Sequence, residues 1–510
     1  MITEKNPVVE IHTGKIKGET RNGVAIFRGI PYGGDCGPGH RFMAPVPAEP
    51  WEGVRDCTKN GPIAVQMGES VAASAPFREY FGGGHPELQG VLEEHQDENC
   101  LVLNVLTGSF DGRRPVLFYI HGGGYTTNSG SIATGGDRLV QEQDIVLVSV
   151  NHRLNAFGAL YLGDLDPKYR DSGNAGMLDL ILALKWVRKN IAAFGGDPDQ
   201  VTLMGESGGG MKISHLLAME EARGLFCRAV VESGSVPVGL YTREQATKDA
   251  LAFLERAGVQ PDKLDLLQQL PVEQLRQAIG FGLNGYAPVA DGIHLMPNTT
   301  GGFCVYPSAK GIPLMVGFSL EEMAAFVPPE IFTISWENLV GELTKSGAGN
   351  PSLTPEQAAS VVSLLREADP EAGPDQIYVR VISMQSPLGG GAHRQAEAMG
   401  KESGAPVYLY TITAGSPYRD TSVTERRYAW HTADLPLQFR IVAHPEQETI
   451  SKLYGNLLGS FVRTGVPSAE AITWPAYTVE KKETLMIGDN GAVAMENPLK
   501  KVYDFFDGFQ

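Results

Sequence analysis

A serine in a glycine-rich turn is the strongest chemical signal in this sequence. The apolar run Val201–Met204 leads into Gly205-Glu206-Ser207-Gly208-Gly209, and a stretch typical of a helix follows. This G-x-S-x-G pattern between a strand and a helix predicts a nucleophile elbow, a strained turn that presents the serine hydroxyl. Side chains at positions 205 and 209 would collide with neighbouring backbone in such a turn. Ser207 is therefore the candidate nucleophile for an acyl transfer.

A second glycine-rich segment, His121-Gly122-Gly123-Gly124-Tyr125, follows the apolar run Val116–Ile120. Glycines after a strand leave backbone N–H groups free to converge on one oxygen, as in an HGGG-type oxyanion hole. We expect the amides of Gly123, Gly124 and Gly208 to be the donors, and His121 to have a structural role. A phosphate-binding loop is the alternative, but no Lys-Ser/Thr pair follows as a P-loop requires.

The elements that must hold these residues alternate between strands and helices. Near-continuous apolar runs predict strands that helices cover on both faces. These runs are Val116–Ile120, Ile145–Val150, Val201–Met204, Ala229–Glu232, Leu314–Val316 and Val407–Thr411. Helical spacing predicts a long helix near Ala175–Phe194, which ends before Gly195-Gly196-Asp197-Pro198. The pattern indicates an α/β fold with a large, mostly parallel sheet, and helical insertions at approximately 242–280 and 335–396.

Taken together, the motifs resemble the type-B carboxylesterase family, which includes the para-nitrobenzyl esterases and the cholinesterases. Besides the serine turn, the resemblance is carried by Phe27-Arg28-Gly29-Ile30-Pro31-Tyr32, Asp97 through Asn104, Asn151-His152-Arg153-Leu154 and Phe194 through Pro198. It spans nearly the whole chain. The resemblance implies an α/β-hydrolase fold, a single domain over residues 1–510, and the hydrolysis of carboxylic esters.

The α/β-hydrolase fold orders its triad along the chain as serine, acid and histidine. Laid on the family's spacing after the strand Leu314–Val316, Glu322 falls at the acid position, and the adjacent Glu321 is the alternative. The resemblance implies that the chosen carboxylate orients the catalytic imidazole through one ring nitrogen.

The base is expected at His431, because Tyr428-Ala-Trp-His431 resembles the family's histidine loop. His393 and His444 are the other histidines after Glu322, and neither has that local pattern. An imidazole with its ordinary pKa of about 6.5 would take the proton of Ser207 and return it to the leaving alcohol.

Four positions depart from the family's pattern. In secreted relatives the cysteine aligned with Cys100 pairs with an earlier one, where this chain has Ala64, so we expect Cys100 to be a free, buried thiol. Gly208 stands where relatives often have alanine, which keeps the amide but gives the loop more freedom. Met323 replaces a small residue and His152 replaces an aromatic one.

Charge and cysteine content restrict the partners. The 42 Lys and Arg against 59 Asp and Glu give a net charge of −17, which disfavours nucleic acid and anionic membranes. No signal-peptide core or membrane-length apolar run is visible. Five cysteines, an odd number without a CxxC pair, favour a reducing cytoplasm. The chemistry needs no metal and no organic cofactor, and both a monomer and a homodimer stay open.

The expected substrate is a small to medium uncharged ester. Tyr125, Phe281 and Phe318 are candidate apolar contacts, together with Tyr286 and Phe326. A lipase, an amidase or a carbamate hydrolase with the same triad is the alternative, because the triad chemistry is shared. A hydrolase-like binding protein without activity is disfavoured, because such proteins typically lack the nucleophile that this chain retains.

Overall fold

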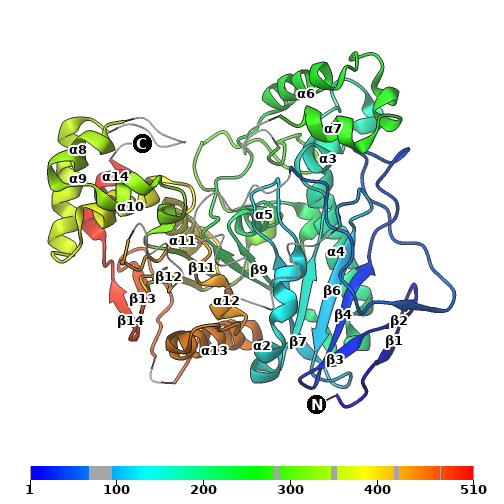
Figure 1. The fold of residues 1–510 in the computed structure, drawn as a ribbon, viewed down its shortest axis with the longest axis horizontal. Coiled ribbons are helices and arrows are strands. Elements are labelled where there is room, and N and C mark those ends of the chain that lie inside the picture. Colours follow the sequence, from blue (N-terminus) through cyan, green and yellow to red (C-terminus); the bar gives the residue numbers. More distant parts are fainter. Residues whose placement is uncertain are drawn as a thin grey trace.

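The computed structural model describes residues 2–67, 95–280, 286–345, 353–417, 424–470 and 472–508. Within these residues the strands form an eleven-stranded sheet of order β14-β13-β12-β11-β10-β9-β7-β8-β6-β4-β3 (Figure 1). The strands are β3 (Glu19–Arg21), β4 (Val24–Pro31), β6 (Val102–Thr107), β7 (Arg114–Ile120), β8 (Val146–Val150), β9 (Gly196–Glu206), β10 (Arg228–Glu232), β11 (Leu314–Ser319), β12 (Val407–Ile412), β13 (Glu483–Gly488) and β14 (Gly491–Glu496). A smaller sheet pairs β2 (Gly14–Lys17) with β1 (Val8–Ile11) and β5 (Val54–Asp56).

The centre of the large sheet is parallel and its two edges are antiparallel. From β8 through β7, β9, β10, β11 and β12 to β13, every neighbouring pair is parallel. The pairs β13–β14, β6–β8, β4–β6 and β3–β4 are antiparallel. The expected mostly parallel sheet is therefore confirmed, and all six expected strands are present.

Alternate residues of the buried strands pack on opposite faces of the sheet. In β7, Val116, Phe118 and Ile120 join one core cluster, whereas Leu117 and Tyr119 join another. The first cluster is closed by α4 (Ala175–Asn190), α5 (Gly208–Leu216) and α11 (Gly390–Glu402). The second is closed by α2 (Asp137–Gln143), α12 (Leu435–Gln438) and α13 (Glu448–Thr464). Helices on both faces explain why these strands are apolar throughout.

Two helical groups lie apart at the upper right and the left of Figure 1. The first contains α6 (Arg243–Ala257) and α7 (Val272–Ala278), which share one apolar cluster with α3 (Asn155–Ala159). The second contains α8 (Trp336–Leu343), α9 (Pro355–Ala368) and α10 (Pro374–Gln385), with the C-terminal α14 (Lys500–Asp507) against α9. Both expected insertions are helical, but the second runs into α11, which covers the sheet.

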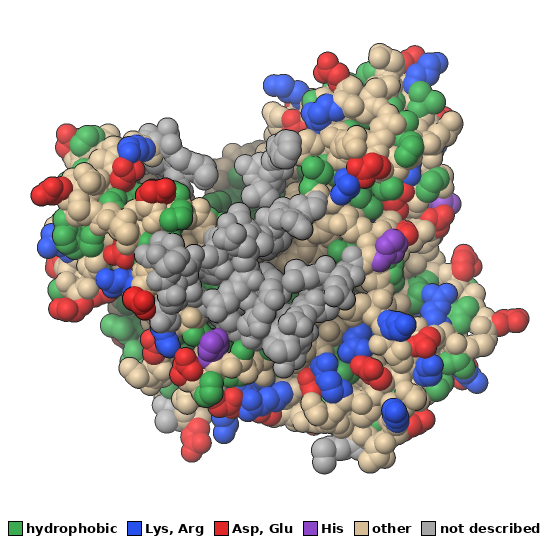
Figure 2. Space-filling model, viewed as in Figure 1, with side chains coloured by type: hydrophobic (Ala, Val, Ile, Leu, Met, Phe, Trp, Pro, Cys, Tyr) green, Lys and Arg blue, Asp and Glu red, His purple; other side chains and the backbone are tan. Residues whose placement is uncertain are grey.

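The surface carries charges of both signs. Figure 2 shows acidic and basic side chains interspersed over one face rather than gathered in a single patch. In the part of the chain that the structure describes, no helix combines the length and the apolar character needed to cross a membrane.

Candidate active site

Ser207 lies at the tip of the sharp turn between β9 and α5. Its backbone has φ 56° and ψ −125°, a conformation that residues with a side chain rarely adopt. A Cβ on Gly205 would lie 2.5 Å from the carbonyl carbon of Gly209, and a Cβ on Gly209 would lie 2.0 Å from the carbonyl oxygen of Ile120. Both positions therefore require glycine, as the turn motif predicts.

The structure brings Ser207, His431 and Glu322 into one hydrogen-bonded chain. The Nε2 atom of His431 lies 2.8 Å from Ser207 Oγ, and its Nδ1 lies 2.5 Å from Glu322 Oε2. All three side chains are buried. One ring nitrogen thus faces the hydroxyl while the other is held by a carboxylate, which is the geometry that a serine nucleophile needs for activation.

The carboxylate of Glu322 is fixed by two further donors. The backbone N–H of Ser319 and the hydroxyl of Ser233 both donate to Oε1, at 2.7 and 2.5 Å. The alternative acid, Glu321, points elsewhere: it accepts hydrogen bonds from Arg380 and from the backbone N–H of Ala429, each at 3.0 Å. Glu321 therefore ties α10 to the histidine segment, residues 428–441, and does not contact the imidazole.

A second buried carboxylate faces the same imidazole. Glu206 Oε1 lies 3.4 Å from His431 Nε2. Burial by itself lowers the pKa of His431, but the charges of Glu206 and Glu322 outweigh it and raise that pKa above its ordinary value. Burial also raises the pKa of Glu206. The expectation of an imidazole near its unperturbed pKa is therefore corrected, because a sequence does not show how many carboxylates converge on one ring.

The glycine amides expected to bind an oxyanion come from two segments that lie against each other. Gly123 and Gly124 have φ of 80° and 60°, which glycine adopts freely. A Cβ on Gly208 would lie 2.5 Å from the amide nitrogen of Gly124, so the loop lies directly against the start of α5. Among the described residues, these three amides donate to no backbone acceptor.

The motif that follows β7 has a structural histidine, as expected. His121 is buried, its Nδ1 lies 2.9 Å from the carbonyl oxygen of Gly122, and its ring stacks on His152 with 4.8 Å between centroids. An aromatic ring at position 152 could stack in the same way, so nothing in the structure explains why histidine stands there.

A model of the carboxylesterase family matches residues 5–506. The chain belongs to the carboxylesterase family. It is 32% identical to a para-nitrobenzyl esterase of Bacillus subtilis (strain 168), over 96% of each chain.

Solved structures agree with this assignment. An esterase of Clostridium hathewayi, described as able to hydrolyse aliphatic aromatic polyesters, has a TM-score of 0.80 at 31% identity and covers 98% of each chain. A carboxylesterase of Geobacillus stearothermophilus has a TM-score of 0.79 at 31% identity, covering 98% of this chain and 99% of its own. The protein is thus an α/β-hydrolase-fold enzyme that hydrolyses carboxylic esters.

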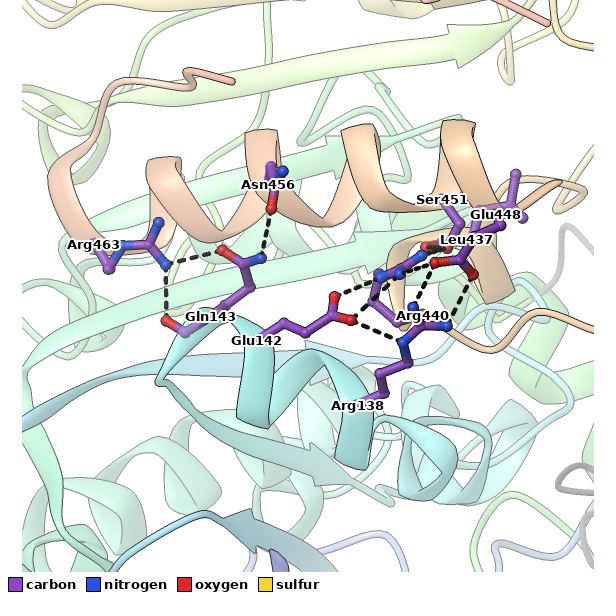
Figure 3. Close-up of polar contacts among 9 residues, drawn as sticks. All are labelled: Arg138, Glu142, Gln143, Leu437, Arg440, Glu448, Ser451, Asn456 and Arg463. Atoms are coloured by element: carbon purple, nitrogen blue, oxygen red, sulfur yellow. Dashed lines mark hydrogen bonds and ion pairs between the residues drawn. The ribbon is translucent and has the colours of Figure 1, made fainter. Parts of the chain in front are cut away.

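In this carboxylesterase, Arg440 anchors the histidine segment to α2 and α13. The buried guanidinium donates to Glu142 of α2 at 2.7 Å, and to Glu448 and Ser451 of α13 at 2.7 and 2.6 Å (Figure 3). Arg440 has φ 63°, so the chain turns sharply where it leaves α12. Arg440 therefore ties the end of the histidine segment to two helices that cover one face of the sheet.

The side chains expected to contact the substrate of the carboxylesterase differ in how far they are exposed. Phe326 is 51% exposed and its ring centroid lies 5.5 Å from that of His431. Tyr125 is half-buried, with its hydroxyl 3.3 Å from His215 Nδ1. Phe318 is 1% exposed and packs in the core, which favours packing over a substrate contact, and Tyr286 is also buried. Phe281 lies outside the described residues.

Sequence reasoning missed Ser233, the charge of Glu206, and Lys212. Ser233 directly follows the expected strand Ala229–Glu232, at the same sheet edge as Ser207, and that position was the available signal.

The thiol of Cys100 is free and buried, as expected, and the other four cysteines are also free. Within the described residues, no group of three or more His, Cys, Asp or Glu side chains is placed to hold a metal ion.

Proposed function

We propose that this carboxylesterase acts through a Ser207–His431–Glu322 triad and an acyl-enzyme. The observation that carries the proposal is the continuous hydrogen-bonded chain from Ser207 Oγ through His431 to Glu322, which begins at the strained turn. A serine hydroxyl is a weak nucleophile at neutral pH and needs an adjacent, oriented base.

The proposed reaction moves one proton back and forth. Ser207 Oγ attacks the ester carbonyl while His431 Nε2 takes its proton, and the amides of Gly123, Gly124 and Gly208 donate to the oxyanion that forms. His431 then gives the proton to the leaving alcohol, which leaves the acyl group on Ser207. A water molecule, deprotonated by His431, releases the acid and restores the serine.

Small to medium uncharged esters are the proposed substrates. The exposed ring of Phe326 beside His431 supports an apolar group near the reacting carbonyl. The net charge of −17 disfavours anionic esters, and the name of the Bacillus relative supports benzyl esters as ligands of the same class. A series of nitrophenyl esters of increasing acyl length, with a matched nitroanilide, separates this proposal from lipase and amidase activity.

Labelling and substitution test the triad. A fluorophosphonate probe is expected to label Ser207, and Ser207→Ala is expected to lose both labelling and turnover. Ser360→Ala, at an exposed position of α9, should keep both. His431→Ala is expected to lower kcat by about 10⁴–10⁶, as other triad removals do. Full turnover by Ser207→Ala would exclude the triad, and near-normal rates in His431→Ala would move the base to His393 or His444.

We also propose that the enzyme works in a reducing compartment such as the cytoplasm. The five free cysteines, three of them buried, support this location, because secreted proteins of this size more often pair their cysteines. Cell fractionation followed by activity measurement tests the proposal, and activity confined to an extracellular fraction would contradict it.

A further inference from the structure

A buried lysine lies beneath the glycine-rich loop. Lys212 is on α5, five residues after Ser207, and is 1% exposed. Its Nζ donates to the carbonyl oxygen of Gly124 at 2.8 Å and to that of His121 at 3.2 Å. Within the described residues Lys212 forms no ion pair, and its hydrogen bonds go to these two backbone carbonyls.

The two carbonyls stand on either side of the proposed donors. The carbonyl of His121 precedes the peptide units that carry the amides of Gly123 and Gly124, and the carbonyl of Gly124 follows them. One ammonium group therefore holds both ends of this short segment. Because glycine has the widest conformational freedom of any residue, a run of three glycines has the most to gain from such a constraint.

The same helix face also carries the third donor. Gly208 and Lys212 are four residues apart on α5 and so lie one turn above each other. A Cβ on Gly208 would lie 2.1 Å from the carbonyl oxygen of Gly124, the atom that Lys212 binds. The absence of a side chain at 208 lets the loop approach the helix, and the ammonium group of Lys212 holds it there.

Stability alone does not account for a lysine at this place. Burying an ammonium group without a carboxylate costs free energy, and this burial lowers the pKa of Lys212 to about 7. Two groups near it offer no negative charge. The ring of Tyr125 lies 5.7 Å away, and His121 is neutral because burial, together with the charge of Lys212, lowers its pKa to about 3. A protonated or a neutral amine has at least two N–H groups, so either form can hold both carbonyls.

We propose that Lys212 is a positioning residue for the oxyanion hole: by binding the carbonyls of His121 and Gly124, it keeps the amides of Gly123 and Gly124 aimed at the same point as the amide of Gly208. The inference deepens the proposed function and rests on it. Lys212 acts through the loop and does not touch the substrate.

A pair of ketone inhibitors tests this role in the whole enzyme. A trifluoromethyl ketone accepts Ser207 Oγ at its carbonyl carbon, the serine proton passes to His431, and the carbonyl oxygen becomes an oxyanion. The matched methyl ketone binds without this step. In Lys212→Met, kcat and trifluoromethyl ketone affinity are expected to fall together by about 10- to 100-fold, the size of effect that a misplacement of about 1 Å produces. Methyl ketone affinity and KM are expected to change less than threefold, about the scatter of small packing effects.

Lys482→Met is the matched control. Lys482 is partly buried, and its Nζ lies 3.1 Å from Glu397 and 3.3 Å from His393 Nε2. Neither contact involves a residue of the proposed triad, so the loss of Lys482 is expected to lower stability and leave kcat unchanged. If Lys212→Met does not fold, the affinities for the trifluoromethyl ketone and the methyl ketone are measured in Lys212→Gln instead, whose shorter side chain keeps an N–H donor.

Two results would overturn the inference: a wild-type kcat with wild-type trifluoromethyl ketone affinity, or an equal loss of affinity for both ketones, which indicates general damage to the site. Ser207→Ala, measured alongside, keeps the two proposals apart. Turnover by Ser207→Ala refutes the triad itself, whereas an inactive Ser207→Ala with an unaffected Lys212→Met refutes only the role of Lys212.

Discussion

Ser207 combines backbone strain with close packing of its neighbours. A side-chain-bearing residue at φ 56° costs of order 1–3 kcal/mol, and the surrounding structure must compensate for it. Here the backbone N–H of Ser207 donates to the carbonyl oxygen of Glu232 on β10 at 2.8 Å. Glycines at 205, 208 and 209 leave out side chains whose Cβ would lie within 2.5 Å of backbone atoms. The strained turn places Oγ within reach of His431.

Relatives often have alanine at this position, but in this chain a Cβ on Gly208 would lie 2.1 Å from the carbonyl oxygen of Gly124, which Lys212 binds. Gly208→Ala is therefore expected to push the loop away and to lower kcat by about 100-fold. Steady-state kinetics with a nitrophenyl ester measures this effect. Gly108→Ala, at a site with no atom within 4 Å of the added Cβ, is the control and should keep wild-type kinetics. Full activity in Gly208→Ala would show that the loop can retreat without loss of its amides.

The carboxylates around His431 predict an alkaline shift of activity. The base must be neutral, and its pKa is raised above the ordinary 6.5, so kcat/KM is expected to rise with pH through an apparent pKa above that value. Glu206→Gln removes a carboxylate 3.4 Å from Nε2, destabilises the imidazolium and is expected to lower the apparent pKa. Glu220→Gln, on the surface, should leave the pH profile unchanged; an unshifted profile in Glu206→Gln would contradict the assignment.

Elements far apart along the chain hold the three side chains of the proposed triad. Ser207 comes from the β9–α5 turn, Glu322 follows β11, and His431 lies after β12 in a segment with little regular structure. That segment depends on side-chain bonds instead: Glu321 binds its backbone from one side and Arg440 fastens its end to α2 and α13 (Figure 3). The position of His431 is thus a property of several elements.

Arg440→Met is expected to lower the free energy of unfolding by about 1.5–3 kcal/mol, because a buried guanidinium that binds three side chains is lost. Arg138→Met is a matched control in the same network. Its side chain is 44% exposed, so its ion pairs should contribute less than about 1 kcal/mol. Denaturant unfolding measures both variants, and equal losses would show that Arg440 is not the main anchor.

For the whole molecule, the sheet and its two helical layers bury most of the thiols. Cys36, Cys57 and Cys100 are buried, Cys227 is half-buried and Cys304 is exposed. Burial raises the pKa of Cys36 to about 12 and that of Cys57 to about 11. These thiols therefore resist reaction for two reasons: reagents cannot reach them, and little of the reactive thiolate forms.

An aromatic disulfide reagent is therefore expected to modify Cys304 rapidly, Cys227 more slowly, and the three buried thiols only after unfolding. Titration of the native and the denatured enzyme, without reductant, counts the thiols in each state. Cys304→Ser should remove the fast phase. Fewer than five reactive thiols in the denatured enzyme would reveal a disulfide.

The sequence was sufficient where chemistry depends on neighbours along the chain. The turn around Ser207, the glycine segment after β7 and the apolar strands are local patterns, and steric rules translate them directly into structure. The choice of Glu322 over Glu321 came from the family's spacing, and the structure places Glu322, rather than its neighbour, against His431.

Only the tertiary structure decided which distant groups share the site. Ser233, Lys212 and Arg440 belong to no local motif, and the motif that contains Glu206 does not show what its carboxylate faces. The effect of all four side chains depends on what the fold places beside them. The same holds for Phe318, whose apolar character fits a pocket wall and a core equally well until burial is known. Electrostatic and packing forces act through space, and a linear pattern records only separation along the chain.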